Sequence, residues 1–185
     1  MYPNLVVTVL PRIEESLWAK VILAIVGTAI LALSAKVQIP FWPVPMTMQT
    51  FVVLVLGMAY GARLGAVTVG LYLIEGAAGL PVFATGSGLA YIIGPTGGYL
   101  IGFLFASYVI GMLANHGWDR SMIKTLGAML VGTVIIFIMG IAWLSTFIGF
   151  EKAIAAGLIP FIPSELFKIA LALFIIPSIW KYTQE

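Results

Sequence analysis

The chain alternates between long apolar segments and short polar connections, and the apolar segments have the lengths of membrane-spanning helices. A helix needs roughly 20 predominantly apolar residues to cross a bilayer. Most of these segments are bounded by prolines, glycines or charged residues, which end helices or mark the membrane surface. The predicted spans are residues 17–35, 50–62, 64–75, 100–114, 126–147 and 164–180. We therefore predict an all-α membrane protein with six transmembrane helices in one bundle.

Two of the predicted spans, residues 50–62 and 64–75, are shorter than a comfortable crossing and are joined at a Gly-Ala-Arg-Leu-Gly hinge over residues 61–65. Both are expected to extend into their flanking residues. Residues 1–16 are mixed in character and are predicted to form an interfacial N-terminal segment. Residues 148–163 read as a short amphipathic segment on the surface. We interpret residues 1–185 as a single integral membrane domain.

Composition strengthens the membrane interpretation, because 62% of the residues are apolar and only 9% are charged. Soluble domains carry about a quarter charged residues. The sequence has no cysteine, which excludes disulfides and thiolate chemistry, and its single histidine, His116, lies in a polar turn. A phosphate-binding Gly-x-x-x-x-Gly-Lys-Ser/Thr loop is also missing from the sequence. We predict that the chain is not an enzyme and does not itself hydrolyse ATP.

The distribution of lysine and arginine predicts the orientation of the bundle. Loops on the cytoplasmic side of a membrane carry an excess of Lys and Arg. With a cytoplasmic N-terminus, most of the nine cations lie inside, namely Arg12, Lys20, Arg63, Arg120, Lys124 and Lys181, whereas Lys36, Lys152 and Lys168 lie outside. We therefore place both termini in the cytoplasm.

The longest connection, residues 76–99, is rich in glycine and carries no charged residue. Irregular backbone near membrane depth is tolerated only where protein or a water-filled cavity satisfies its polar groups. The segment also carries aromatic and hydroxyl side chains, a mixture that suits a small amphipathic ligand. We interpret it as the wall of a pocket near the outer face rather than as a plain surface connection.

The preceding outward-facing connection, residues 36–49, contains Pro40, Pro43 and Pro45, which fix an extended and stiff conformation. Two interpretations stay open for this segment. It is either a rigid interfacial loop or a lid that presents Thr47 and Gln49 to a ligand.

The start of the last predicted span carries the most informative charged pair, Glu165 and Lys168. Residues three apart on a helix share one face. Ser164 is predicted to cap this helix, with Glu165 in its first turn where the helix dipole favours an acid. The pair is either a simple intrahelical ion pair or a ligand clamp. A cyclic urea would suit such a clamp, and a ligand carboxylate on Lys168 is the alternative.

In the first predicted span, small residues recur every four positions at Ala24, Thr28 and Ala32. Small residues at this spacing let another helix approach closely. The partner of this face is either a helix of the same bundle or a separate subunit.

Four motifs in this order resemble the BioY family, the biotin-binding S components of energy-coupling factor (ECF) vitamin transporters. They are IPFWPVPMTMQT, GARLGAVTVGLYLIEGAAGLPVF, GPTGGYLIGF and PFIPSELFK. The resemblance implies a six-helix bundle in the cytoplasmic (inner) membrane of a prokaryote that binds biotin near the outer face. In this family a full transporter adds a transmembrane coupling subunit and two ATPase subunits, although some members are thought to work without that module.

The resemblance also implies which residues hold the ligand. Thr47 and Gln49 would belong to the loop that covers it, and Glu165 and Lys168 match the family's acid-x-x-lysine motif. The pocket wall would include Phe83, Thr85 and Tyr99. The chain departs from the family in three places. Glu165 stands where the family usually has Asp, and Thr85 stands where relatives often have Asn. In the first helix, Ala24-x-x-x-Thr28 stands where an Ala-x-x-x-Ala docking motif is common.

We therefore expect high-affinity biotin binding and uptake by a substrate-capture subunit, with biotin as the transported substrate and no cofactor. An S component for a different vitamin is one alternative, and a biotin transporter acting without a dedicated ATPase module is another. A membrane-embedded enzyme and a purely structural subunit are the remaining classes. The seven acidic residues are too scattered to form the active site of a membrane-embedded enzyme. A purely structural subunit would bind no small molecule.

Overall fold

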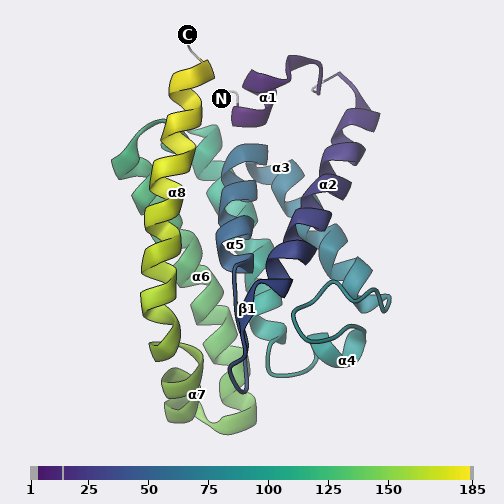
Figure 1. The fold of residues 1–185 in the computed structure, drawn as a ribbon, viewed down its shortest axis with the longest axis vertical. Coiled ribbons are helices and arrows are strands. Elements are labelled where there is room, and N and C mark those ends of the chain that lie inside the picture. The colour runs from purple at the N-terminus through teal and green to yellow at the C-terminus, as the bar shows by residue number, and fades with distance from the viewer. Residues whose placement is uncertain (1–3, 14, 184–185) are drawn as a thin grey trace.

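A computed structural model describes residues 4–13 and 15–183 of the chain, without the side chains of residues 12 and 181–183. The fold consists of helices and one short hairpin (Figure 1). The long helices are α2 (Leu17–Lys36), α3 (Gln49–Ala77), α5 (Gly97–Asn115), α6 (Met122–Ile148) and α8 (Ile162–Thr183). The short helices are α1 (Leu5–Val9), α4 (Leu89–Ile92) and α7 (Phe150–Gly157), with 3₁₀ turns η1 (Pro11–Ile13), η2 (Trp118–Arg120) and η3 (Ile159–Phe161). Strands β1 (Gln38–Ile39) and β2 (Met46–Thr47) pair antiparallel.

Five helical stretches of the described residues are long and apolar enough to cross a membrane. They are residues 17–36, 49–77, 97–115, 122–148 and 150–180. Large apolar side chains such as Leu33, Ile123 and Phe174 are exposed on the outside of the bundle. This is the arrangement expected where lipid rather than water surrounds the helices. The predicted all-α membrane class is confirmed.

Helix α3 reverses direction at Gly61, so it makes two passes rather than one. The backbone there is not helical, with φ at 75° and ψ at 177°. A Cβ atom built on Gly65 would lie 3.2 Å from the Cα of Gly57, although eight residues of straight helix span about 12 Å. The two halves are therefore antiparallel neighbours. The two short spans predicted on either side of residues 61–65 are present, and with them the described helices make six passes.

Close approaches between backbones hold the bundle together. A Cβ on Gly57 would lie 2.9 Å from the carbonyl oxygen of Ser107, where α3 meets α5. A Cβ on Gly102 would lie 3.0 Å from the Cα of Ile136, where α5 meets α6. Small residues permit this proximity, which is the main way that helices pack inside membranes. Helix α5 thus lies between α3 and α6 and forms the centre of the fold.

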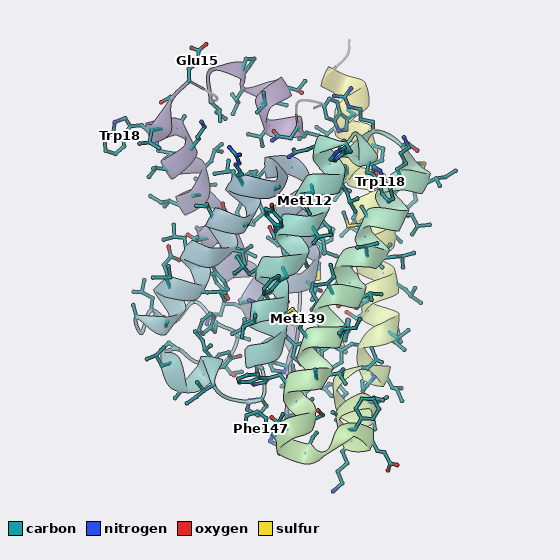
Figure 2. The ribbon with its side chains drawn as sticks, turned by 180° about the vertical axis from the view of Figure 1, so that it is seen from behind. Glu15, Trp18, Met112, Trp118, Met139 and Phe147 are labelled. Carbon is teal, nitrogen blue, oxygen red and sulfur yellow. The ribbon has the colours of Figure 1, made fainter. Side chains whose placement is uncertain are left out.

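The unusual connections gather at one end of the molecule. Figure 1 shows both termini at the end opposite the hairpin and α7, and α4 also lies toward the hairpin end. Figure 2 shows Trp18 and Trp118 near the terminal end and Phe147 near the other. The proline-rich connection, the glycine-rich connection and the start of α8 therefore share the end away from the termini. The predicted amphipathic segment corresponds to α7 and η3.

The repeated small residues of α2 face the bundle. Ala24 and Thr28 are buried and Ala32 is half-buried. The hydroxyl of Thr28 donates a hydrogen bond to Glu75 Oε1 of α3 at 3.1 Å. Packing within the bundle, one of the two alternatives left open by the sequence, thus describes this face. Docking of a partner subunit on Ala24, Thr28 and Ala32, the other alternative, stays a prediction.

Candidate functional site

A buried polar cluster lies at the head of α8. Lys168 is 3% exposed and Glu165 is 4% exposed. The Lys168 ammonium donates to Glu165 Oε1 at 2.6 Å, to Thr50 Oγ1 at 2.9 Å and to the main-chain carbonyl of Thr47 at 2.7 Å. Thr50 in turn donates to the same Glu165 oxygen at 2.9 Å. The lysine therefore joins α8 to the hairpin and to the start of α3.

The second carboxylate oxygen of Glu165 is buried and accepts no hydrogen bond from the residues that the structure describes. A buried acceptor without a donor is unfavourable, typically by about 1–3 kcal/mol and more when charged. Glu165 lines a cavity together with Lys168. This oxygen is consequently suited to accept a hydrogen bond from a ligand in that cavity.

The start of α8 differs from the expectation. The helix begins at Ile162, so Ser164 lies inside its first turn and is not its capping residue. Proline is tolerated in the first turn because the N–H groups there have no helical partner. Pro163 therefore does not delay the helix. The spacing of Glu165 and Lys168 on one face is unchanged by this shift.

The hairpin brings a second polar pair to the site. Thr47 ends β2, and Gln49 begins α3. The Thr47 hydroxyl donates to Gln49 Oε1 at 3.2 Å and accepts the backbone N–H of Gln49 at the same distance. Gln49 Nε2 donates to the hydroxyl of Tyr72 at 2.6 Å. These contacts hold the Gln49 amide in one orientation beside the cavity.

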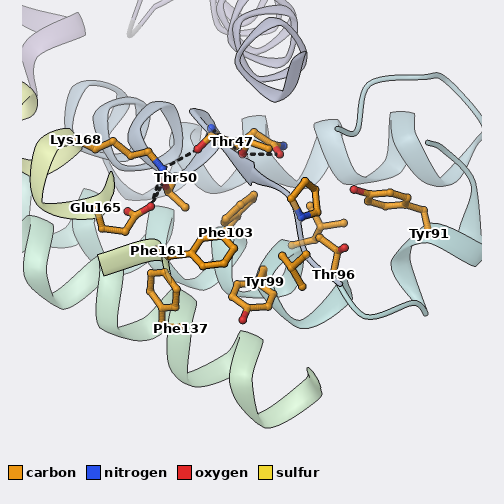
Figure 3. A pocket seen from close by; sticks show the side chains of 14 residues that line it. Thr47, Thr50, Tyr91, Thr96, Tyr99, Phe103, Phe137, Phe161, Glu165 and Lys168 are labelled. Atoms are coloured by element: carbon orange, nitrogen blue, oxygen red, sulfur yellow. Dashed lines mark hydrogen bonds and ion pairs between the residues drawn. The ribbon is translucent and has the colours of Figure 1, made fainter. Parts of the chain in front are cut away.

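Aromatic rings form the apolar wall of the cavity. Figure 3 shows Tyr99, Phe103, Phe137 and Phe161 between the polar cluster and the opposite side, where Tyr91 and Thr96 lie. Phe137 meets Tyr99 and Phe161 in edge-to-face contacts with ring centroids 6.0 Å apart. The Tyr99 hydroxyl donates to the carbonyl of Gly157 at 2.8 Å. This bond directs the hydroxyl toward the end of α7.

The cavity is small. Its volume is about 30 Å³, whereas pockets that hold small molecules measure roughly 300–1,000 Å³. The hairpin residues Val44, Pro45 and Thr47 form part of its lining. In this conformation the cavity is smaller than a site that holds a vitamin-sized ligand.

Five of the seven predicted ligand residues are brought together. Thr47, Gln49, Tyr99, Glu165 and Lys168 all line the cavity. The other two do not. Phe83 is fully buried behind the wall, where its ring stacks on Tyr91 at 5.0 Å. Thr85 is exposed.

Several lining residues were not predicted from the sequence, namely Thr50, Phe103, Phe137 and Phe161. Thr50 directly follows Gln49, a predicted ligand residue, so its position in the sequence could have indicated that it lines the pocket. Phe161 lies between Pro160 and Pro163, within the PFIPSELFK motif. Phe103 and Phe137 stand in apolar spans, where a ring facing a pocket has the same sequence pattern as one facing lipid.

The geometry defines a class of protein: a multi-pass membrane protein with a small, partly charged and partly aromatic cavity inside one end of its helix bundle. The chain belongs to the BioY family, whose family model matches residues 9–185. The family suggested by its motifs is thereby confirmed.

Curated relatives cover most of the chain. A probable biotin transporter BioY from Pyrococcus horikoshii is 38% identical over 148 residues, which are 80% of this chain and 87% of the relative. The biotin transporter BioY from Thermotoga maritima is 37% identical over 160 residues, which are 85% and 94% of the two chains.

A solved structure has the same fold. The crystal structure of the S-component for biotin from an ECF-type ABC transporter matches with a TM-score of 0.76 and 27% sequence identity. The match covers 88% of this chain and 90% of that one.

Proposed function

We propose that this protein captures biotin with high affinity and takes it up across the cytoplasmic membrane as the S component of an ECF-type transporter. The observation that carries the proposal is the buried cluster of Lys168, Glu165 and Thr50 against an aromatic wall, in a chain whose relatives are named biotin transporters. A bicyclic vitamin with a polar urea and an apolar thioether ring matches both halves of this pocket.

Each part of biotin has a counterpart in the cavity. The unpaired Glu165 Oε2 can accept an N–H of the cyclic urea, and the Lys168 ammonium can donate to the urea carbonyl. The thioether ring can pack against Phe103, Phe137 and Tyr99, since sulfur makes favourable contacts with aromatic rings. The alternative orientation places the valerate carboxylate on Lys168.

Binding requires the hairpin to move, because a cavity of about 30 Å³ cannot contain biotin. In the closed form Lys168 donates to the Thr47 carbonyl. We infer that the hairpin acts as the lid, the second of its two interpretations, and that the arriving ligand replaces part of this contact.

The charge distribution supports cytoplasmic termini. Asn4 Nδ2 donates to the carbonyl of Tyr60 at 2.9 Å, so the N-terminal helix lies beside the reversal at Gly61 and near Arg63. Lys36 and Lys168 lie at the pocket end instead. Under the positive-inside rule the pocket then faces the outside of the cell.

A coupling subunit and two ATPase subunits would supply the energy for release into the cell, since the chain lacks a phosphate-binding loop. The fold supports this assignment, because the solved structure that it matches is the S-component for biotin from an ECF-type ABC transporter. Transport without a dedicated ATPase module is the alternative, as is binding of a different vitamin.

Equilibrium binding of labelled biotin to the purified protein tests the proposal. We expect saturable binding at one site that unlabelled biotin displaces and that thiamine and riboflavin do not. Displacement by thiamine or riboflavin but not by biotin would assign the protein to a different vitamin. The absence of binding to any of the three would contradict a capture function.

A further inference from the structure

Tyr72 connects the pocket to the glycine-rich connection without lining the pocket. It lies in the second half of α3 and is fully buried. Its hydroxyl donates to the carbonyl of Val82 at 2.9 Å and accepts from Gln49 Nε2 at 2.6 Å. Val82 belongs to the glycine-rich connection, and Gln49 lines the cavity.

The donor and acceptor chemistry of these groups fixes the direction of each hydrogen bond that links Tyr72 to Gln49 and to Val82. A tyrosine hydroxyl has one proton, and a main-chain carbonyl can only accept. The Tyr72 proton is therefore committed to Val82, and its oxygen accepts from the Gln49 amide. Gln49 must then turn its NH₂ group toward Tyr72 and its Oε1 toward Thr47, whose hydroxyl donates to it. Thr47, Gln49, Tyr72 and Val82 thus form a one-way relay.

The receiving segment is itself held on several sides. Three consecutive carbonyls accept side-chain hydrogen bonds from three different elements: Val82 from Tyr72, Phe83 from Lys36 at 2.6 Å, and Ala84 from Gln38 at 3.2 Å. The Phe83 ring also meets the Tyr72 ring edge-on, with the ring centroids 5.4 Å apart, and stacks on the ring of Tyr91. The end point of the relay is therefore held by contacts from three elements.

We propose that Tyr72 is a positioning residue for biotin that acts through Gln49. Its hydroxyl holds the Gln49 amide so that a fixed donor and acceptor pattern faces the cavity when the ligand arrives. Without that hydroxyl the amide can rotate, and binding must order it again. This inference rests on the proposed function, since biotin is the ligand used to test it.

The test compares Tyr72→Phe with Tyr60→Phe. Tyr60 lies in the same reversing helix, is 7% exposed, and its hydroxyl donates to the carbonyl of Leu23 at 3.1 Å, beside the opposite end of the bundle. Both variants lose one buried tyrosine hydroxyl. Loss of a buried hydrogen bond lowers stability, so we expect Tm to fall in both variants, and further in Tyr72→Phe, which loses two hydrogen bonds where Tyr60→Phe loses one. Only Tyr72→Phe should weaken biotin binding, by about 3- to 10-fold.

A double-mutant cycle with Gln49→Ala separates positioning from a general structural role. If Tyr72 acts through Gln49, adding Tyr72→Phe to Gln49→Ala should leave the biotin affinity of the single Gln49 variant unchanged. Gln49→Asn removes the same contact by changing Gln49 instead of Tyr72, because it keeps an amide but is one methylene too short to reach Tyr72. It should lose affinity by a similar factor.

Unchanged affinity in Tyr72→Phe or in Gln49→Asn would overturn the inference, and so would additive losses in the cycle. Equal loss of biotin affinity in Tyr60→Phe would also overturn it, by showing that the effect is one of stability. These outcomes are distinct from failure of the proposed function, in which the unmodified protein itself would not bind biotin.

Discussion

The ammonium of Lys168 donates a hydrogen bond at 2.7 Å to the main-chain carbonyl of Thr47, 121 residues earlier in the chain. This contact joins the head of α8 to the hairpin that forms part of the cavity lining. The same ammonium lies 2.6 Å from Glu165. One lysine therefore contacts both the hairpin and the acidic residue of the cavity, so a ligand that takes a hydrogen bond from Lys168 would also affect its contact with the hairpin.

The first prediction concerns this lysine. Lys168→Ala should weaken biotin binding by at least about 30-fold, because removing one partner of a buried charge pair typically costs about 2–5 kcal/mol. Lys152→Ala is the matched control, since Lys152 lies on α7 at the same end and is exposed. Equilibrium binding to both purified variants measures the difference. Equal affinities for biotin would remove Lys168 from the site.

The second prediction separates charge from length at Glu165. Glu165→Asp keeps the carboxylate and should stay within about 10-fold of the original affinity, whereas Glu165→Gln should lose more. The glutamine amide has only one oxygen to share between Lys168 and the ligand. Competition titration with labelled biotin ranks the variants. Full affinity in the Gln variant would show that the carboxylate charge is dispensable.

The third prediction concerns the orientation of biotin. If the urea lies between Glu165 and Lys168, biotin methyl ester should compete within about 10-fold of biotin, because a rim-exposed charge contributes little. Diaminobiotin, which lacks the urea carbonyl, should compete poorly. The reverse order of the two competitors would place the carboxylate on Lys168.

The fourth prediction concerns the reversal in α3. Gly61→Ala should destabilise the fold, because φ is +75° and the added Cβ, 2.6 Å from Asn4 Nδ2 and 2.7 Å from Asn115 Oδ1, would displace the Asn4 amide from its hydrogen bond with the Tyr60 carbonyl. Gly79→Ala is the control, since φ there is +101° and a Cβ would have no described neighbour within 4 Å. Backbone strain of this kind costs roughly 1–3 kcal/mol at either site. Thermal unfolding should therefore show the larger fall in Tm for Gly61→Ala, and equal falls would rule out the steric contribution.

The fifth prediction concerns pH and the turn between α5 and α6. Asp119 is 1% exposed, and this burial raises the pKa of its carboxyl above the ordinary value of 3.8. Hydrogen bonds to the carboxyl, including one from Trp180 Nε1 at 2.9 Å, and the positive charge of the nearby Arg120 oppose the shift. Between the unfolded and folded pKa values the folded protein binds the proton and the unfolded chain does not. Stability therefore falls as pH rises through this window.

Asp119→Asn should remove that dependence while keeping an oxygen for the Trp180 N–H. The Tm of the variant relative to the original protein should rise as the pH is raised above about 4, the region where an unfolded aspartate loses its proton. A difference in Tm that is constant across this range would contradict the assignment to Asp119.

The sequence predicted the parts of the fold that depend on local pattern. Apolar length located the passes, and the glycines around residue 61 located the reversal that the structure places at Gly61. The spacing of Glu165 and Lys168 placed both on one helical face. The gathering of the proline-rich connection, the glycine-rich connection and the start of α8 at one end followed from the number of passes, because alternate connections of a bundle lie on the same side.

The sequence could not predict features that depend on distant neighbours. Phe83 lies in a loop, yet it is fully buried because Gly76 leaves space for its ring and Tyr72 and Tyr91 cover it. Phe103 and Phe137 face the cavity rather than lipid, and the hydrophobicity of the sequence does not distinguish these two orientations. The start of α8 was misplaced by two residues, because a preceding 3₁₀ turn leads directly into the helix.

The position of bound biotin tests the central claim most directly. A determined structure of the complex would locate the urea relative to Glu165 and Lys168. We predict that both side chains lie within hydrogen-bond distance of the urea, with the thioether ring against Tyr99, Phe103 and Phe137. Biotin bound outside this cavity, or bound inside it with the urea turned away from both charged residues, would contradict the account.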